Sequence, residues 1–168
     1  GGGGDSAGNE TRGIFSGHGP NNTTMQFITF ASEGNTITFG DNTYGQSSTT
    51  RVCNASSTRF LNMGDYQWKN TIDFVEINTL GDAVDFGDLT ALKAQGTGFS
   101  SPVRSMYAGG YSPGSVFPST IDSVITASKG NAIDFGSMTN AVKCNGGGSG
   151  NFTRGIISGG NNNTGSYI

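Results

Sequence analysis

Charged side chains are scarce in this sequence, which has nine Lys and Arg and 12 Asp and Glu among 168 residues and a formal net charge of −3. Proteins bind nucleic acid through Lys and Arg that neutralise phosphates, so this balance argues against a nucleic-acid partner. No apolar run approaches the roughly 20 residues that span a bilayer, which argues against membrane insertion. The opening stretch, GGGGDSAGNE, contains neither the basic region nor the apolar core of a signal peptide.

Histidine and cysteine are nearly absent, which limits the chemistry that the chain can support. The single histidine, His18, lies between two glycines, and one histidine is too few for a multi-histidine zinc site. We therefore predict no catalytic residue, no metal and no cofactor. The two cysteines, Cys53 and Cys144, are too few for a disulfide scaffold. The middle repeat has Ala94 at the matching place, so both cysteines are predicted to be small buried strand residues.

Glycine is abundant, and it punctuates a β-hairpin pattern that occurs three times. The pattern is clearest at 70–90, NTIDFVEINTLGDAVDFGDLT, returns at 119–139 as STIDSVITASKGNAIDFGSMT, and is looser at 24–43, TMQFITFASEGNTITFGDNT. In each copy, glycine followed by Asn or Asp accepts the backbone angles of a tight turn. Together with 11 Phe and 5 Tyr, this pattern predicts a packed all-β repeat protein.

Three further positions recur at nearly constant spacing. Four arginines are separated by 47, 45 and 50 residues, each is followed five residues later by a glycine, and each hairpin ends in a Phe-Gly pair. These structural repeat positions are Arg12, Arg59, Arg104 and Arg154, then Gly17, Gly64, Gly109 and Gly159, and Phe39, Phe86 and Phe135. The guanidinium offers a fixed fork of donors, so we expect each arginine to be a hydrogen-bond anchor, either from one repeat to the next or from a strand to a loop.

The spacing predicts four strands in each repeat. A first strand begins at the arginine, the hairpin supplies the second and third, and a fourth is expected near 49–54, 91–95 and 141–145. Four short antiparallel strands in about 47 residues match the blade of a β-propeller. A β-sandwich or a β-prism stalk is the alternative.

Organisation along the chain follows from this spacing. We predict a single repeat domain over 1–168, with repeats at about 11–57, 58–102, 103–152 and a partial 153–168. This makes three full blades and the start of a fourth. Because propellers usually close with four to eight blades, we expect a segment of a longer chain.

The repeat resembles the kelch-type blade. The resemblance lies in the glycine doublets Gly109-Gly110 and Gly159-Gly160, the hairpin and the large aromatic; the family has tryptophan where this chain has the three repeat phenylalanines. The stretches TRGIFSGHG, NTIDFV and GNAIDFG are similar to kelch-like repeats in virion structural proteins of marine tailed phages. This resemblance implies a propeller, an extracellular or virion localisation, and partners that are copies of the chain or other virion proteins. The segments Gly17-His18-Gly19 and Gly64-Asp65 depart from the doublet.

Two loops that break the repeat contain the candidate ligand-binding residues. The loop at 65–70 contains Tyr66 and Trp68, and the longer loop at 111–118 begins with Tyr111. Both loops follow the arginine strand, so we expect them on one face. Aromatic side chains among Asn, Gln and Asp can stack on sugar rings of cell-surface glycans; the alternative is packing against a neighbouring repeat or chain.

The recurring carboxylates, such as Asp73 and Asp122, occupy the same place in each repeat, which predicts structural hydrogen bonds rather than one catalytic site. We therefore expect a non-enzymatic structural or adhesive module of an extracellular assembly, such as a phage tail fibre or virion surface protein. A polysaccharide-degrading enzyme is the first alternative, and it would depend on non-repeat carboxylates such as Glu10, Glu33 or Asp65. A partner-binding kelch domain is the second.

Overall fold

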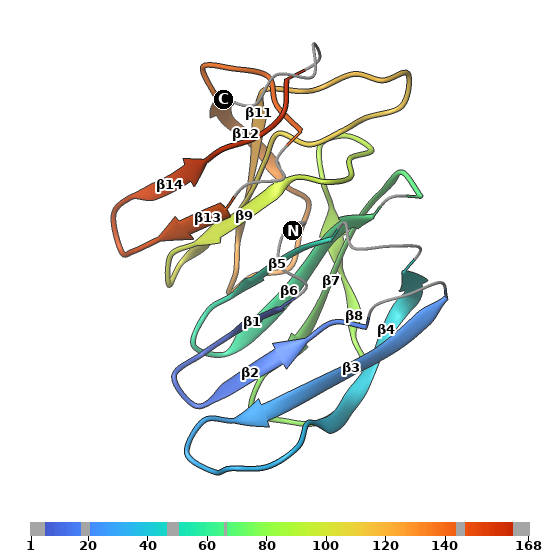
Figure 1. The fold of residues 1–168 in the computed structure, drawn as a ribbon, viewed down its shortest axis with the longest axis vertical. Helices are drawn as coiled ribbons and strands as arrows, with labels where there is room; N and C mark the ends of the chain where they lie inside the picture. Colours follow the sequence, from blue (N-terminus) through green and yellow to red (C-terminus); the bar gives the residue numbers. More distant parts are fainter. Residues whose placement is uncertain (1–5, 18–20, 47–50, 66, 144–146, 163–168) are drawn as a thin grey trace.

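The chain folds entirely as antiparallel β-sheet over the residues that the structure describes. The computed structural model describes residues 6–17, 21–46, 51–65, 67–143 and 147–162, which contain 14 strands and no helix (Figure 1). It follows that no helix in these ranges could cross a membrane. The all-β prediction is confirmed.

The strands form three four-stranded sheets and one two-stranded sheet, each built from consecutive strands. The first sheet contains β1 (Ser6–Gly8), β2 (Arg12–Phe15), β3 (Asn22–Thr29) and β4 (Ile37–Gln46). The second contains β5 (Val52–Ala55), β6 (Arg59–Asp65), β7 (Lys69–Glu76) and β8 (Val84–Asp88). The third contains β9 (Thr97–Ser100), β10 (Arg104–Ala108), β11 (Thr120–Ile125) and β12 (Ile133–Ser137), and the fourth contains β13 (Gly147–Gly150) and β14 (Gly155–Ser158).

The arginine strand is the second strand of each sheet, and this corrects the expected order of strands. The segment near 49–54 does not close the first sheet: β5 pairs with β6 and opens the second. The third and fourth sheets open with β9 and β13, a few residues after the expected 91–95 and 141–145. The first strand of each sheet therefore precedes the arginine in the chain and forms a hairpin with the arginine strand.

A short side chain three residues before each arginine explains this hairpin. Asn9 Oδ1 accepts hydrogen bonds from the backbone N–H of Thr11 and of Arg12, at 2.9 and 2.8 Å. Ser56, Ser101 and Asn151 make the equivalent pair of bonds before the other three arginines. Such side-chain turns hold the backbone in a reversal. The pattern of Asn or Ser three residues before Arg is visible in the sequence, and it marks the start of each second strand.

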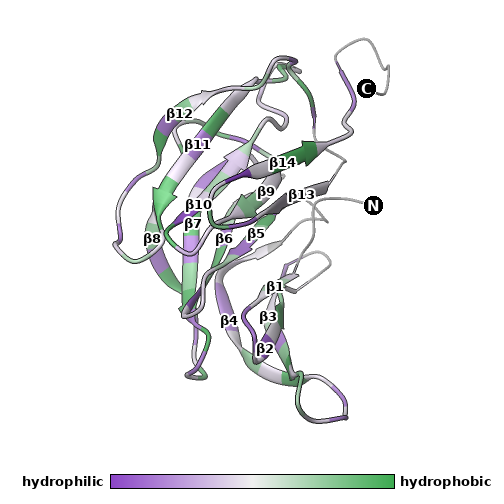
Figure 2. Cartoon of the chain, turned by 90° about the vertical axis from the view of Figure 1, so that its left-hand side faces the viewer, coloured by the Kyte–Doolittle hydropathy of each residue, from purple (hydrophilic) through white to green (hydrophobic). Residues whose placement is uncertain are grey.

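The first strands of successive sheets lie side by side, and the sheets fan out from them (Figures 1 and 2). A narrow groove of about 230 Å³ follows these strands and is lined by residues of β1, β5, β9 and β13. Cys53 lies half-buried on β5, and its Sγ lies 2.8 Å from Asn62 Oδ1; Cys144 is outside the described residues. The described strands do not close into a ring.

Apolar side chains fill the two junctions between the four-stranded sheets. The first junction, between the first and second sheets, contains Ile14, Met25, Phe27 and Phe39 facing Phe60, Val75, Ile77 and Ala83. The second junction, between the second and third sheets, contains Leu61, Met63, Ile72, Phe74 and Phe86 facing Tyr107 and Val124, with Ala132 beside them. Each sheet is therefore stabilised by its neighbours, as in repeat proteins whose stability comes from nearest-neighbour interfaces.

The repeat arginines connect these sheets. Arg12 Nη1 donates to the carbonyl of Ile77 in the second sheet at 2.8 Å, and Arg59 Nη1 donates to the carbonyl of Thr126 in the third at 3.0 Å. Each guanidinium also lies over an aromatic ring of its own sheet, that of Phe27 or Phe74, at 4.9 and 4.8 Å. At both junctions, therefore, a repeat arginine donates to a backbone carbonyl of the next sheet.

At each junction the hairpin turn of the following sheet docks on the outer strand of the preceding one. In the first junction Gly81 N–H donates to the carbonyl of Phe39 at 3.1 Å, and Ala83 N–H donates to the carbonyl of Asp41 at 2.7 Å. Asp82 Oδ1 accepts from Asp41 N–H at 2.9 Å. These three bonds join the turn to the strand at the Phe-Gly pair.

The second junction repeats this docking with the next turn. Gly130 N–H donates to the carbonyl of Phe86 at 2.9 Å, and Ala132 N–H donates to the carbonyl of Asp88 at 2.7 Å. Asn131 Oδ1 accepts from Asp88 N–H at 3.0 Å. Asn131 therefore performs the task of the aspartate in the first junction, so the recurring Gly-Asp or Gly-Asn turn has a docking role as well as a conformational one.

Glycine is required beside the repeat phenylalanine because the docked turn leaves no room for a side chain. A Cβ at Gly40 would lie 2.1 Å from the carbonyl oxygen of Gly81, and one at Gly87 would lie 2.5 Å from that of Gly130. Neighbouring Phe39 and Phe86 are buried against Phe27 and Phe74. The Phe-Gly pair thus combines a buried ring with close backbone contact.

The glycines five residues after the arginines end the second strands. Gly64, Gly109 and Gly159 have φ of 65°, 62° and 70°, in the left-handed region. Gly17 does not share this conformation; instead, a Cβ there would lie 2.5 Å from the carbonyl oxygen of Thr24.

Replacing Arg59 with alanine is expected to lower the free energy of unfolding by about 1–2 kcal/mol, because the bond to the Thr126 carbonyl, the contact with Phe74 and the ion pair of Nε with Glu76 Oε1 at 2.8 Å are lost. Arg104→Ala is the matched control: this arginine is exposed and donates to no carbonyl among the described residues. Its replacement is expected to cost less than about 0.5 kcal/mol. Chemical denaturation of both variants measures the difference, and equal losses would contradict the anchoring role.

Candidate functional site

Trp68 lies in the tight turn between β6 and β7. Asp65 and Lys69 face each other at the ends of these strands, and Trp68 N–H donates to the carbonyl of Asp65 at 3.0 Å. The φ of Trp68 is 57°, which is uncommon for a residue with a large side chain. Such a conformation is maintained only where surrounding contacts favour it. The indole is half-buried.

Tyr111 opens the long loop between β10 and β11. Gly109 and Gly110, both with positive φ, turn the chain so that Tyr111 pairs with Ala94 through two backbone hydrogen bonds. Farther along the loop, Ser112 pairs with Val116, and this pairing narrows the loop into a small hairpin. The pairing with Ala94 therefore fixes the backbone of Tyr111 at the start of the loop.

The two aromatic side chains meet, whereas the sequence predicted only that their loops lie on one face. The Trp68 and Tyr111 rings lie 4.9 Å apart between centroids and tilt by 50°, and Phe117 lies 5.5 Å from Tyr111. Lys143 Nζ lies 5.8 Å from the centroid of the Tyr111 ring. We call Trp68, Tyr111, Phe117 and Lys143 the aromatic cluster. Tyr66, the third predicted residue, is outside the described residues.

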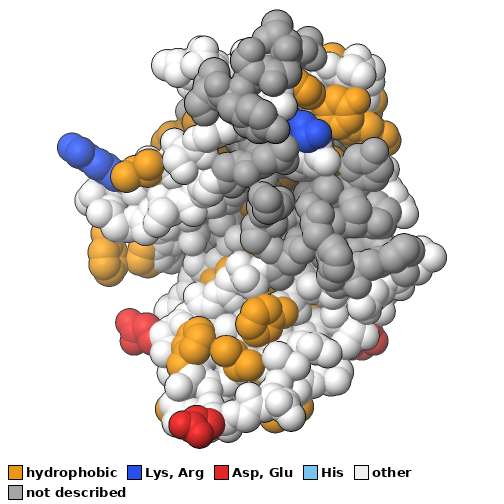
Figure 3. All heavy atoms as spheres, in the orientation of Figure 1, with side chains coloured by type: hydrophobic (Ala, Val, Ile, Leu, Met, Phe, Trp, Pro, Cys, Tyr) orange, Lys and Arg blue, Asp and Glu red, His pale blue; other side chains and the backbone are white. Residues whose placement is uncertain are grey.

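This cluster joins two sheets and also reaches the surface. Trp68 extends from the second sheet and Tyr111 from the third, so their contact includes the packing between repeats that was the alternative interpretation. All members are half-buried, and hydrophobic side chains gather beside a basic one at the upper right of Figure 3. The Tyr111 hydroxyl shares a hydrogen bond of 3.0 Å with Ser115 Oγ. An apolar ring face beside hydroxyls and an ammonium group can bind a ligand that is itself apolar on one side and polar at its edge.

Sequence reasoning did not identify Phe117 and Lys143 as part of this cluster. Phe117 was within the loop noted for its length, but nothing in its spacing indicated that it would contact Tyr111. Lys143 is some thirty residues from the loop, and its backbone pairs with Asn161 rather than with the loop itself. Only the arrangement of the third and fourth sheets brings it over the ring.

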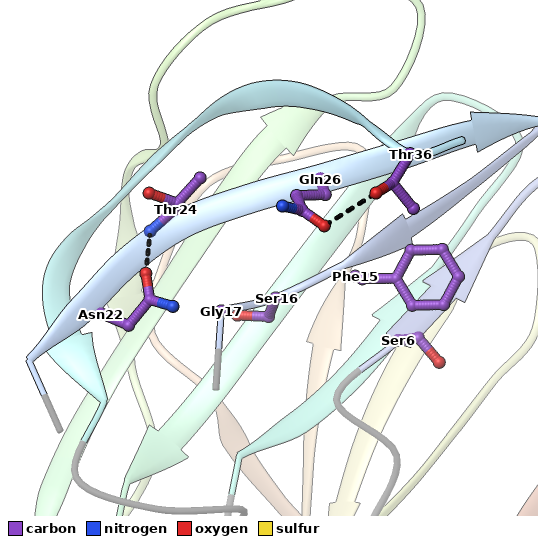
Figure 4. Close-up of a pocket in the computed structure, with 8 residues that line it drawn as sticks. All are labelled: Ser6, Phe15, Ser16, Gly17, Asn22, Thr24, Gln26 and Thr36. Carbon is purple, nitrogen blue, oxygen red and sulfur yellow. Dashed lines mark hydrogen bonds between the residues drawn. The ribbon is translucent and has the colours of Figure 1, made fainter. Parts of the chain in front are cut away.

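A second hollow lies on the first sheet and was not predicted. It has a volume of about 450 Å³ and is lined by Ser6, Phe15, Ser16, Gly17, Asn22, Thr24, Gln26 and Thr36 (Figure 4). Thr36 Oγ1 donates to Gln26 Oε1 at 2.9 Å, and Phe15 is exposed beside them. In the second sheet, Asn62 and Asp73 occupy the places of Phe15 and Gln26 and are buried. The departure from the repeat at these two positions is the signal that the sequence contained.

The recurring aspartates are buried cross-links between sheets. Asp122 accepts hydrogen bonds from Thr90 N–H at 3.0 Å and Thr90 Oγ1 at 2.8 Å, and Lys93 Nζ lies 2.7 Å from its Oδ1. Asp73 accepts from Thr43 Oγ1 at 2.8 Å. Burial raises the pKa of Asp73, partly offset by that hydrogen bond. Asp73 on β7 thus holds β4 of the sheet before it, and Asp122 on β11 holds the loop that follows β8.

The non-repeat carboxylates that an enzyme would need are not gathered. Glu10 and Glu33 are exposed, whereas Asp65 is buried with its Oδ2 3.9 Å from Arg51 Nη2. In the part of the chain that the structure describes, no group of three or more His, Cys, Asp or Glu is placed to hold a metal ion. His18 is outside those residues.

The fold and the two surfaces define an all-β protein of repeated antiparallel sheets, with an aromatic cluster where two loops meet and a hollow of about 450 Å³ on the first sheet. No protein-family model matches the chain, and no curated protein matches it significantly.

Proposed function

We propose that this chain is a non-enzymatic structural and adhesive module of an extracellular assembly. In this proposal its sheets are kelch-like propeller blades, and the assembly is a phage virion, with the module in a tail fibre or on the particle surface. Its partners are copies of itself or other virion proteins, and cell-surface glycans of the host.

The repeated junctions support the structural part of this proposal. Two successive junctions use the same arginine anchor and the same docked turn, as expected of an array whose units each recognise the next. The first strands that lie side by side around a narrow groove support the propeller proposal, because the blades of a propeller surround a common axis. Low charge and polar loops suit a surface that works outside the cell.

The aromatic cluster is the single observation that carries the adhesive part. Two loops that depart from the repeat bring Trp68 and Tyr111 into contact next to Lys143, while the repeat positions elsewhere serve packing. A sugar ring has an apolar face that can stack on the exposed side of such rings, and hydroxyls that can bond to Ser115 and the lysine.

Trp68→Ala is expected to weaken binding to host surface polysaccharide by about tenfold, because one stacking surface is removed. Binding of purified wild-type and variant protein to immobilised polysaccharide measures this change. Phe152→Ala is the control, since Phe152 is 84% exposed and belongs to the fourth sheet's hairpin rather than to the cluster. Unchanged binding by Trp68→Ala, or an equal loss in the control, would contradict the adhesive role. Finding the polypeptide only in soluble host cytosol, and never with particles, would contradict the structural one.

A further inference from the structure

The third sheet has the docking surface of the first and second sheets, but nothing among the described residues covers it. Phe135 is 56% exposed, whereas the equivalent Phe39 and Phe86 are 3% and 2% exposed. No atom lies within 4 Å of the position of a Cβ on Gly136, whereas the equivalent positions on Gly40 and Gly87 touch a docked turn. The outer strand of this sheet, β12, is exposed along its whole length.

The polar groups of this surface are also available. By equivalence with the two junctions, the carbonyls of Phe135 and Ser137 and the N–H of Ser137 face the place of a docked turn, and none is bonded across a junction within the described chain. Arg104, the equivalent of Arg12 and Arg59, donates to no carbonyl there. The backbone groups of Phe135 and Ser137 and the guanidinium of Arg104 therefore correspond to the hydrogen-bonding groups used in the first and second junctions.

An apolar groove completes the surface. It has a volume of about 540 Å³ and lies between the third sheet and the fourth, with Met106, Ile121 and Phe135 on one side and Phe152, Arg154 and Ile157 on the other. Met106, Ile121 and Phe135 are the equivalents of Leu61, Ile72 and Phe86, which pack in the second junction. The partners missing from the groove are the equivalents of Val124 and Ala132, one from a strand and one from a turn.

We propose that this surface, defined by Arg104, Phe135, Gly136 and Ser137, is a docking site for a β-hairpin of the chain's own repeat type. The hairpin's turn, Gly-Asp or Gly-Asn followed by Ala, docks on β12. Its strand carbonyl accepts from Arg104, its small apolar side chains fill the groove, and its first strand pairs with β14, whose other edge is paired with β13. The proposed contact between this hairpin and the third sheet therefore has the same geometry as the first and second junctions.

The first sheet of a second copy fits this site poorly. Its turn, Gly34-Asn35, has Thr36 where the docked turns have Ala83 and Ala132. Its first strand would also have to lie beside β9, as β9 lies beside β5, and β13 already occupies that place. The occupant specified by the surface is therefore a free repeat hairpin and not another whole sheet.

A peptide of residues 70–90 tests this site, because it contains Val75, Ile77 and Ala83, the groups with which the second sheet docks on the first. Isolated hairpins are marginally stable, so the peptide is closed by a disulfide between cysteines added at its ends. Titration of the labelled peptide with the whole 168-residue protein, followed by fluorescence anisotropy, is expected to show saturable binding of one peptide per protein. The control peptide Ala83→Arg is expected to bind at least about tenfold more weakly, because Ala83 is buried where it docks.

Two protein variants locate the binding. Gly136→Ala places a Cβ where a docked turn would approach, and we expect at least about tenfold weaker binding. Arg104→Ala removes one charge-assisted bond from an exposed position, and we expect about a threefold to tenfold loss. Absence of peptide binding, or unchanged binding by both variants, overturns the proposal. Self-association of the wild-type protein that excludes the peptide and is abolished by Gly136→Ala also overturns it, because the occupant would then be a second copy.

Discussion

Replacing Asp122 with alanine is expected to lower the free energy of unfolding by about 3–5 kcal/mol, the largest effect of any single change considered for this chain. Asp122 and Lys93 are both 1% exposed, and Lys93 Nζ lies 2.7 Å from Asp122 Oδ1. Without the carboxylate, the ammonium group is left in the protein interior with Thr120 Oγ1, at 2.7 Å, as its one hydrogen-bond acceptor among the described residues. Two bonds from Thr90 are lost as well, so the loop after β8 is released.

Two variants distinguish this charge effect from a general loss of packing. Asp85→Ala removes an exposed carboxylate from β8 in the second sheet and is expected to change stability by less than about 0.5 kcal/mol. Lys93→Met combined with Asp122→Leu removes both charges and is expected to recover part of the loss, because no buried charge remains unpaired. Urea denaturation of the three proteins gives the comparison. A double variant that is less stable than Asp122→Ala would contradict the explanation.

Gly87→Ala is expected to lower the free energy of unfolding by about 2–3 kcal/mol, because its Cβ would lie 2.5 Å from backbone atoms of Gly130. The backbone carbonyl cannot rotate away as a flexible side chain would. The turn must therefore move, and this weakens the bonds from Gly130 N–H and Ala132 N–H to the outer strand. The predicted loss is a property of the junction and not of the second sheet alone.

Gly136→Ala is the matched control for this steric effect. Gly136 and Gly87 have φ of 145° and 152°, so alanine meets the same backbone strain at both positions. A Cβ at Gly136 has no neighbour within 4 Å, and the control is therefore expected to cost about 1 kcal/mol, the strain alone. Thermal or chemical unfolding measures the two variants. If Gly136→Ala lowers the free energy of unfolding as much as Gly87→Ala does, backbone strain alone explains the loss at Gly87, and contact with the docked turn contributes nothing to it.

Both predictions place stability in the junctions. The second sheet docks its turn on the first sheet and receives the turn of the third sheet on β8, so it is stabilised on two sides. No turn among the described residues docks on the outer strand of the third sheet, so β12 is exposed along its whole length. Unpaired sheet edges promote association, and the docking geometry restricts which hairpin can associate there.

Local structure was readable from the sequence because it depends on neighbours along the chain. The glycine of each Gly-Asn or Gly-Asp turn, the alternating strands around it, and the left-handed glycines after the second strands all reflect backbone preferences within a few residues. The position of the first strands was missed, although Ser56 and Ser101 mark it by their bonds to the backbone before Arg59 and Arg104. That signal is also local, and it was present in the sequence.

The partners of the repeat residues were decided only by tertiary structure. Arg59 was recognisable as an anchor, but its acceptor is the carbonyl of Thr126, a backbone atom that no side-chain pattern identifies. The loops of Trp68 and Tyr111 were expected on one face, whereas the contact of the two rings and the approach of Lys143 to Tyr111 were not predicted.

Buried charged residues show most clearly the difference between what the sequence determines and what the tertiary structure decides. Lys93 and Arg51, whose burial no sequence pattern predicted, are fully buried beside carboxylates from neighbouring strands or sheets. A charged side chain is stable in the interior only where a partner meets it at bonding distance, and that distance depends on how whole sheets pack. The sequence alone therefore determined strands, turns and the repeat. The packing of one sheet on the next decided which of these residues hold the protein together and which surface is left open.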